Sequence, residues 1–217
     1  LAYSFENNFN DDGLGHAEYF INNYNRDIEY AKTFDFKTDK SISDLWNDLE
    51  SNDIKDRAIA VVDPLIETRW NQDCFYNEYA PYDNWGPCNR AYAGCVACAM
   101  SQVMKYWNYP EKGKGSHTYV HHQYGSQSAD FGATTYKWDE MPNEIWNQND
   151  AIATLMYHCG VSVDMDYGAD GSGAQSHDVE AAMRMYFGYS SAKYKERSDY
   201  SDEEWISLLK SELDESR

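Results

Sequence analysis

The chain has 217 residues, which is enough to bury one or two hydrophobic cores. Hydrophobic residues make up 42% of it and aromatic residues 16%, which excludes an intrinsically disordered chain. A formal net charge of −19 excludes a nucleic-acid-binding protein, because such proteins neutralise phosphates with Lys and Arg. The sequence has neither the apolar run of about 20 residues that a membrane span needs nor the start of a signal peptide.

The N-terminal segment, 1–57, is polar and predicts two helices. Apolar residues recur at helical spacing over 17–31 and again over 42–49. An acidic stretch then precedes the apolar run 58–62, as expected for a linker that leads into a new domain. We therefore predict a domain boundary near Arg57, which gives domains of 1–57 and 58–217.

An irregular loop and a helix follow. Residues 70–94 are rich in Pro, Gly, Asn and Tyr, which is typical of a surface loop. Val96, Met100, Val103 and Trp107 then fall at helical spacing, and Pro110 marks the exit, so Cys95 lies in the first turn of a largely buried helix. The N–H groups and the dipole of a helix N-terminus favour the reactive thiolate. Inert buried cysteines also occupy such positions, so both interpretations of Cys95 stay open here.

Cys95 and Cys98 form a C-x-x-C motif, which also occurs in redox pairs and zinc sites. Zinc needs a second pair of ligands, and the nearest candidates, Cys88, His121 and His122, make no recognisable pattern. A thioredoxin-like motif follows a strand, whereas this one follows a loop. With five cysteines in the chain, at least one has no intrachain partner. We therefore expect neither a zinc site nor a redox-catalytic pair here, and the choice between a nucleophilic and an inert Cys95 stays open at this point.

The C-terminal part predicts three elements and a last helix. The three elements are a helix over 152–159 closed by Gly160, an alternating strand over Val161–Tyr167, and a helix over 179–187 closed by Gly188. The last helix begins with a capping box, Ser201 with Glu204, and its apolar face consists of Trp205, Leu208, Leu209 and Leu213. It reaches Arg217 without a stop signal, so we expect the domain to be incomplete at that point.

The residues around Cys95 resemble the nucleophile helix of the streptopain family of papain-like cysteine peptidases. The shared run is Gly94–Pro110, with Gly-Cys-Val-Ala at its start and Gln-x-Met-Lys-Tyr and Tyr-Pro later. Upstream, Trp70–Gln72 with Tyr76–Asn77 resembles the loop that supplies the oxyanion glutamine of that family. Further blocks in the same order are Gly160–Gly168, Ser172–Gly173, Phe187–Tyr189, Arg197–Ser198 and the helix from Trp205.

This resemblance covers about Val61 to Arg217 and implies an α+β class with a papain-like cysteine peptidase fold. Residues 58–217 would be its left, nucleophile-bearing helical part, and 1–57 resemble the C-terminal part of a propeptide. The family consists of bacterial cysteine endopeptidases made as zymogens, so the protein is expected to be secreted, periplasmic or at the cell surface. Its expected partners are protein or peptide substrates and its own propeptide, without a cofactor, a nucleic acid or a membrane span.

The resemblance also implies roles for single residues. Cys95 would be the nucleophile and Gln72 an oxyanion donor. Substrate contacts are expected at Asp166, Gly171, Ser172 and Gly173. The motif that carries the family's catalytic histidine does not occur here, so we expect that histidine on a C-terminal continuation or a second chain. Surface or structural roles are therefore expected for His16, His117, His121, His122, His158 and His177.

Three questions stay open from the sequence. A non-enzymatic adhesin or interaction module that retains the peptidase fold is the competing hypothesis to an endopeptidase. Cys98 replaces the small or hydroxyl residues usual in the family, and we expect it to pack inside the helix. Cys74 and Cys88 could form a disulfide across the oxyanion loop, but the sequence does not fix the pairing.

Overall fold

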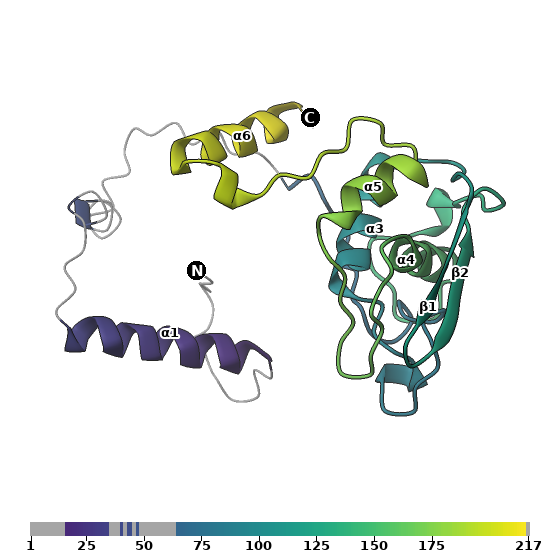
Figure 1. The fold of residues 1–217 in the computed structure, drawn as a ribbon, viewed down its shortest axis with the longest axis horizontal. Coiled ribbons are helices and arrows are strands. Elements are labelled where there is room, and N and C mark those ends of the chain that lie inside the picture. Colours follow the sequence, from purple (N-terminus) through teal and green to yellow (C-terminus); the bar gives the residue numbers. More distant parts are fainter. Residues whose placement is uncertain (1–15, 35–39, 41–42, 45–46, 48–63, 216–217) are drawn as a thin grey trace. The chain divides into compact units, whose positions relative to one another are not determined.

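The computed structural model describes residues 16–34, 40, 43–44, 47 and 64–215, and it divides the chain into a unit of Leu1–Ala60 and a unit of Val61–Arg217 (Figure 1). In the first unit, helix α1 spans His16–Thr33 and confirms the first predicted helix. Its described side chains are exposed, including Tyr24 at 64% and Ile28 at 51%. The predicted helix over 42–49 and the boundary near Arg57 lie mostly outside the described residues.

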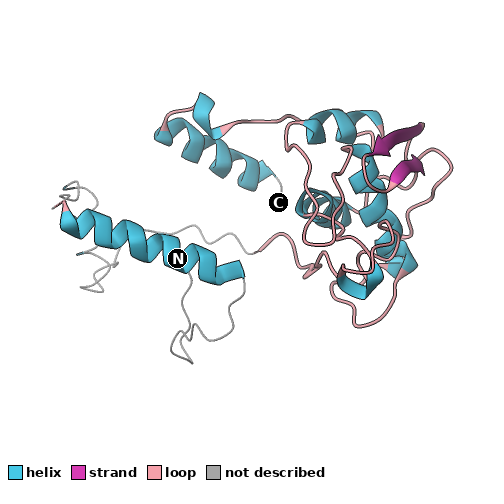
Figure 2. Ribbon diagram, turned by 60° about the horizontal axis from the view of Figure 1, so that its bottom comes forward, coloured by secondary structure: helices cyan, strands magenta, loops and turns pink. Residues whose placement is uncertain are grey.

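The second unit combines helices and long loops with a two-stranded sheet (Figure 2). Helix α4 is at its centre, because it contacts α3, α5 and both strands. The elements of this unit, in chain order, are η1 (Pro87–Asn89), α3 (Cys95–Trp107), β1 (Ser116–His121), β2 (Gly125–Asp130), η2 (Trp138–Glu140), α4 (Asp150–Ser162), α5 (Asp178–Met185), η3 (Arg197–Asp199) and α6 (Asp202–Glu215).

Helix α3 starts at Cys95 as predicted, and Asn108 ends it in the left-handed conformation. Its buried face differs from the predicted stripe, because Val103 is 40% and Trp107 52% exposed. The face turned to the core carries three small residues and two flexible methionines: Ala97, Cys98, Met100, Ser101 and Met104. This face packs against α4, and Val103 and Trp107 lie away from that contact.

The hairpin of β1 and β2 was not predicted from the sequence. Its strands are antiparallel, with Ser116 opposite Asp130 and His121 opposite Gly125. The Tyr157 hydroxyl of α4 donates a hydrogen bond to Gln127 of β2 at 3.0 Å. The sequence feature that could have indicated a strand is the run of β-branched and aromatic residues over 118–120, with a glycine at position 125 for the turn. Polar residues elsewhere in β1 and β2 made that signal weak.

Helix α4 does not end at Gly160, and the predicted strand over 161–167 is absent. The helix continues to Ser162 and ends in a Schellman motif, in which Asp164 takes the left-handed conformation at φ 49°. The Met165 N–H bonds the Gly160 carbonyl at 3.1 Å, and the Asp164 N–H bonds the Val161 carbonyl at 3.3 Å. Asparagine and aspartate are the usual non-glycine residues at such a position.

The last two predicted helices are present, with one shifted end. Helix α5 stops at Met185, before the predicted end, and Gly188 has a φ of 76°. At α6 the capping box is confirmed: the Ser201 N–H donates to Glu204 Oε2 at 2.9 Å, and the Glu204 N–H donates to Ser201 Oγ at 3.4 Å. Among the residues that the structure describes, no helix has the length and apolar character needed to cross a bilayer.

Candidate active site around Cys95

Cys95 is an exposed residue at the N-terminus of α3. The preceding residue must be glycine, because Gly94 has a φ of 95° and a Cβ there would lie 2.6 Å from Met165 Sδ. This close approach places the start of α3 against the segment that follows α4. The thiol therefore stands at the positive end of a helix dipole on a fixed backbone.

The two residues before Gly94 are held by two separate loops. The Ala93 N–H donates to the Gln72 carbonyl at 2.9 Å. The Tyr92 N–H donates to the Gly168 carbonyl at 3.1 Å, and the Ser172 hydroxyl donates to the Tyr92 carbonyl at 2.6 Å. The fold thus brings the predicted oxyanion loop and part of the predicted substrate loop to the backbone just before Cys95.

All four residues predicted to contact substrate lie in one closed loop. Asp166 and Gly173 exchange backbone hydrogen bonds of 2.8 and 3.1 Å, which joins the ends of the loop. Inside it, the Gly168 N–H donates to Ser172 Oγ at 3.0 Å. Gly171 and Gly173 are exposed, Ser172 is partly buried, and the Asp166 side chain points to the surface. The side chain of Ser172 supports this loop and its contact with Tyr92.

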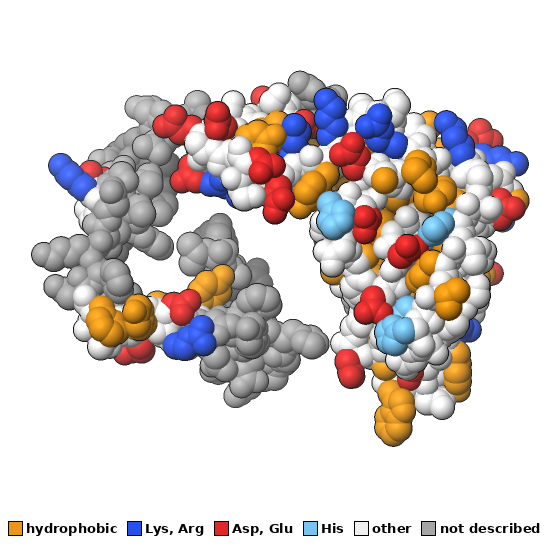
Figure 3. Space-filling model, in the orientation of Figure 1, with side chains coloured by type: hydrophobic (Ala, Val, Ile, Leu, Met, Phe, Trp, Pro, Cys, Tyr) orange, Lys and Arg blue, Asp and Glu red, His pale blue; other side chains and the backbone are white. Residues whose placement is uncertain are grey.

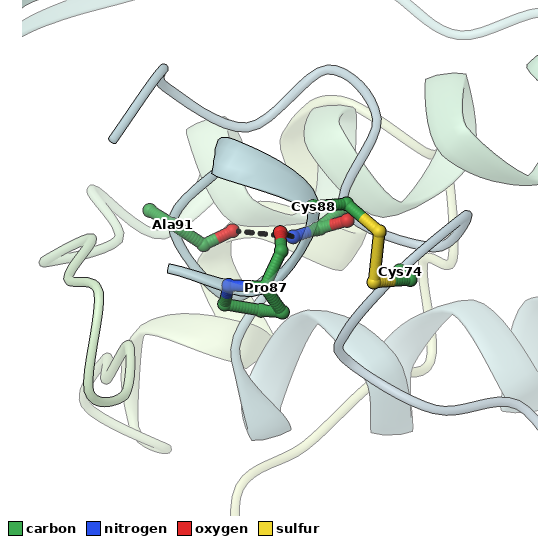
Figure 4. Close-up of a disulfide and its surroundings, with 5 residues drawn as sticks. Cys74, Pro87, Cys88 and Ala91 are labelled. Atoms are coloured by element: carbon green, nitrogen blue, oxygen red, sulfur yellow. Dashed lines mark hydrogen bonds between the residues drawn. A yellow bond between two sulfur atoms is a disulfide. The ribbon is translucent and has the colours of Figure 1, made fainter. Parts of the chain in front are cut away.

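A disulfide joins Cys74 to Cys88, with their Cα atoms 5.3 Å apart (Figure 4). Next to it, the buried Asn77 amide donates hydrogen bonds to the Pro87 carbonyl at 2.9 Å and the Ala91 carbonyl at 3.1 Å. These links cross the loop that follows Gln72. The pairing that the sequence left open is therefore settled, and Cys95, Cys98 and Cys159 are free.

An apolar groove of ≈ 410 Å³ opens beside Cys95, between α3 and the start of α5. The sequence pattern assigned Val179 and Met183 to the core face of a helix, and only their position next to α3 shows that they line this groove. Val96 and Val103 of the predicted buried stripe line it as well. The complete lining is Cys95, Val96, Ala99, Met100, Val103, Ser176, Val179 and Met183.

The other free cysteines are buried. Burial, with the nearby Cys95 as a smaller cause, raises the pKa of Cys98 to about 11. Burial raises the pKa of Cys159 to about 12. Both therefore remain neutral thiols near neutral pH. Among the free cysteines of this chain, Cys95 alone is exposed.

The described histidine side chains each lie against another polar group. His117 Nε2 lies 2.6 Å from Asp164 Oδ1, and His177 Nε2 lies 3.3 Å from Asp178 Oδ1. His158 is buried, with Nδ1 3.0 Å from the Tyr136 hydroxyl. The surface view shows histidine side chains beside acidic ones on this unit (Figure 3). The side chain of His16 lies outside the described residues.

His121, His122 and Asp166 form the one group in the described part of the chain with a possible metal-ligand arrangement. His121 Nδ1, however, accepts hydrogen bonds from the backbone N–H groups of Gln123 and Tyr124, at 3.1 and 3.2 Å. The neutral ring must then carry its proton on Nε2, which lies 2.9 Å from Asp166 Oδ1. An N–H has no lone pair for a metal, and although Asp166 lies close, the buried Nε2 has no partner with hydrogen-bond geometry among the described residues.

The family model of the Peptidase C10 family matches residues 70–217. Among curated proteins, the chain is 35% identical over 164 residues to the thiol protease/hemagglutinin PrtT of Porphyromonas gingivalis, covering 71% of this chain and 18% of that protein. It is 29% identical over 243 residues to streptopain of Streptococcus pyogenes, covering 100% of this chain and 57% of streptopain. The chain thus spans little more than half of streptopain and a smaller share of PrtT.

Two solved structures support the same relationship. Active wild-type interpain A cysteine protease of Prevotella intermedia aligns with a TM-score of 0.63 and 41% identity, covering 68% of this chain and 63% of that one. A fragment of prointerpain A from the same organism aligns with a TM-score of 0.63 and 36% identity, covering 82% of this chain and 64% of the fragment. These similarities confirm the α+β, papain-like fold.

Proposed function

The chain belongs to the Peptidase C10 family, and on that basis we propose that it is the nucleophile-bearing part of a cysteine endopeptidase that hydrolyses peptide bonds. The observation that carries the proposal is Cys95, the exposed free cysteine at the N-terminus of α3. A helix N-terminus favours the thiolate, which is the nucleophilic form of cysteine. The relatives are described as cysteine or thiol proteases, and their activity supports this assignment.

In this mechanism the Cys95 thiolate attacks the carbonyl carbon of the scissile peptide bond and forms a tetrahedral intermediate. The negative oxygen is stabilised by the Cys95 backbone N–H and the Gln72 side-chain amide. The hydrogen bond from the Ala93 N–H to the Gln72 carbonyl supports this role. It ties the Gln72 backbone to Ala93, which lies two residues before the nucleophile. The intermediate then collapses: the scissile C–N bond breaks, the amine product leaves with a proton from the histidine, and an acyl-enzyme remains on Cys95. Water hydrolyses this thioester, which releases the carboxylic acid product and regenerates the thiol.

The general base is a histidine carried by a C-terminal continuation or a second chain. The polar contacts that the described histidine side chains make with other side chains go to Asp164, Asp166, Asp178 or Tyr136, and none of them goes to Cys95. The loop over 166–173 and the groove beside Cys95 provide the surface on which a peptide would lie. The residues up to about Arg57 act as the last part of a propeptide, and the prointerpain A similarity supports this role. The protein acts outside the cytoplasm of a bacterium.

The test is peptide mass spectrometry after incubation with E-64, an epoxide inhibitor of cysteine peptidases, on the longer protein that contains this chain. We expect E-64 on Cys95 and no label in a Cys95→Ala variant, which also loses activity on a denatured protein substrate. Cys159→Ala is the matched control and keeps both properties. An unlabelled Cys95, or equal labelling of all free cysteines, would support the adhesin or interaction module instead.

A further inference from the structure

Cys95 and Cys98 together have an arrangement that peptide hydrolysis does not use. Cys95 is the first residue of α3, and Cys98 comes three residues later in the same helix. Residues at this spacing are neighbours on the helix surface, with Cα atoms about 5 Å apart from the rise and radius of the helix. Disulfides join cysteines whose Cα atoms are about 4.4–6.8 Å apart. The Cα separation in the first turn of α3 therefore fits a disulfide, which would form by rotation of the two side chains and release of the Cys98 thiol from the Trp70 carbonyl.

The two thiols differ in access. Cys95 is exposed and lines the apolar groove, whereas Cys98 is 7% exposed. Cys98 Sγ donates to the Trp70 carbonyl at 3.5 Å, and Gln102 Nε2 donates to Cys98 Sγ at 3.6 Å. A dissolved oxidant reaches Cys95 first, because Cys98 lies beneath the surface. The Gln102 donor can stabilise negative charge on Cys98 when that thiol reacts.

We propose that Cys95 and Cys98 form a reversible disulfide in response to peroxide, which switches off the nucleophile and protects it from irreversible oxidation. Peroxide first transfers an oxygen atom to the Cys95 sulfur: the O–O bond breaks, an S–O bond forms, and a water leaves. Cys98 Sγ then attacks the sulfur of this sulfenic acid, the S–O bond breaks, and a second water leaves. Two thiols lose two electrons and two protons in total, and the peroxide is reduced to two waters. A dithiol reductant reverses the reaction by exchange.

Cys159 provides an internal comparison. It is also a free thiol of the core, but it is fully buried and its Sγ lies 3.7 Å from Met104 Sδ. It sits on α4 instead of the first turn of α3. A response that depends on the Cys95–Cys98 spacing should not require Cys159.

The experiment exposes the longer protein that contains this chain to hydrogen peroxide, blocks the remaining thiols with iodoacetamide, and identifies the peptides by mass spectrometry. In the wild type we expect the peptide with Cys95 and Cys98 to lose two hydrogens and escape alkylation, and dithiothreitol to restore both thiols. The readout is a mass, so it holds whether or not the chain proves to be a peptidase. No such peptide at any peroxide dose, or a Cys95–Cys159 linkage, would overturn the proposal.

Two variants test protection. In Cys98→Ser and Cys98→Ala, we expect Cys95 to proceed to sulfinic acid, which dithiothreitol does not reverse. Cys159→Ala should behave like the wild type. Circular dichroism establishes that the variants are folded. If one of the two Cys98 variants does not fold, the other still provides the test. If the wild type accumulates sulfinic acid on Cys95 as fast as a folded Cys98 variant, Cys98 does not protect the nucleophile.

Discussion

Cys95, Cys98 and Cys159 carry the same thiol, and their surroundings give them different chemistry. Cys95 is exposed at a helix N-terminus, while burial raises the pKa of Cys98 to about 11 and of Cys159 to about 12. His158 shows the same effect with the opposite sign, since burial disfavours its charged form. Its pKa is lowered from 6.5 to about 4. Position in the fold, more than residue type, sets the reactivity of these groups.

His158 should make the folded state sensitive to acid. Its folded-state pKa is lowered, so the unfolded chain binds more protons than the native one between pH 6.5 and about 4. Stability therefore falls as the pH drops through this window, by at most about 3 kcal/mol from this group. Urea unfolding at about pH 7 and about pH 4.5 measures the effect.

The wild type is compared with a His158→Gln variant, whose side-chain amide can still form a hydrogen bond with the Tyr136 hydroxyl. It should be less stable than the wild type near neutral pH, but lose less stability on acidification. An equal loss in both proteins would show that other groups cause the acid sensitivity.

At the level of elements, the helix ends show how local and tertiary forces compete. Gly160 was expected to close α4, because glycine is the commonest residue in the left-handed position after a helix. The structure instead keeps Gly160 inside the helix, where the absence of a Cβ leaves room for the Tyr167 hydroxyl, so this glycine serves close packing and does not end the helix. The left-handed position falls to Asp164, whose carboxylate lies 2.6 Å from His117. By contrast, α6 starts as predicted because its capping box is a purely local contact.

The capping box gives a prediction for α6. Ser201→Ala removes the hydroxyl that accepts a hydrogen bond from the Glu204 N–H, so we expect the helix start to be destabilised by about 1 kcal/mol. Hydrogen exchange of the first-turn amides of α6 should become several-fold faster. Ser207→Ala, an exposed change within the same helix, is the control and should leave this exchange unchanged or slower. Equal exchange in both variants would mean that the cap does not hold the helix start.

At the level of the second unit, contacts distant in sequence hold the surroundings of Cys95 together. The Trp70 indole donates to the Pro142 carbonyl at 2.8 Å, and the Thr68 hydroxyl donates to Gln102 at 2.9 Å. The loop over 70–94 has little regular secondary structure, so its shape rests on such contacts and on the Cys74–Cys88 disulfide. The rigidity of the site therefore depends on links outside α3.

Removing the Cys74–Cys88 disulfide should cost about 3 kcal/mol of unfolding free energy, from the entropy of a closed loop of this length. The double variant Cys74→Ser with Cys88→Ser tests this in urea. Because the Asn77 hydrogen bonds remain, we expect the variant to fold and to label with E-64 more slowly. Dithiothreitol should lower the stability of the wild type but not that of the variant. A variant as stable as the wild type would show that the hydrogen bonds alone hold the loop.

The sequence by itself determined the family, the helix that Cys95 begins, the first and last helices and the capping box, because each rests on local patterns or on residues in a fixed order. Which face of α3 is buried was decided by its packing against α4, and the helical spacing of Val103 and Trp107 pointed to the wrong side. The disulfide pairing, the end of α4, the hairpin and the groove beside Cys95 likewise depended on tertiary structure. Each of them joins segments far apart in the chain, and a local pattern carries no information about which distant segment will lie beside it.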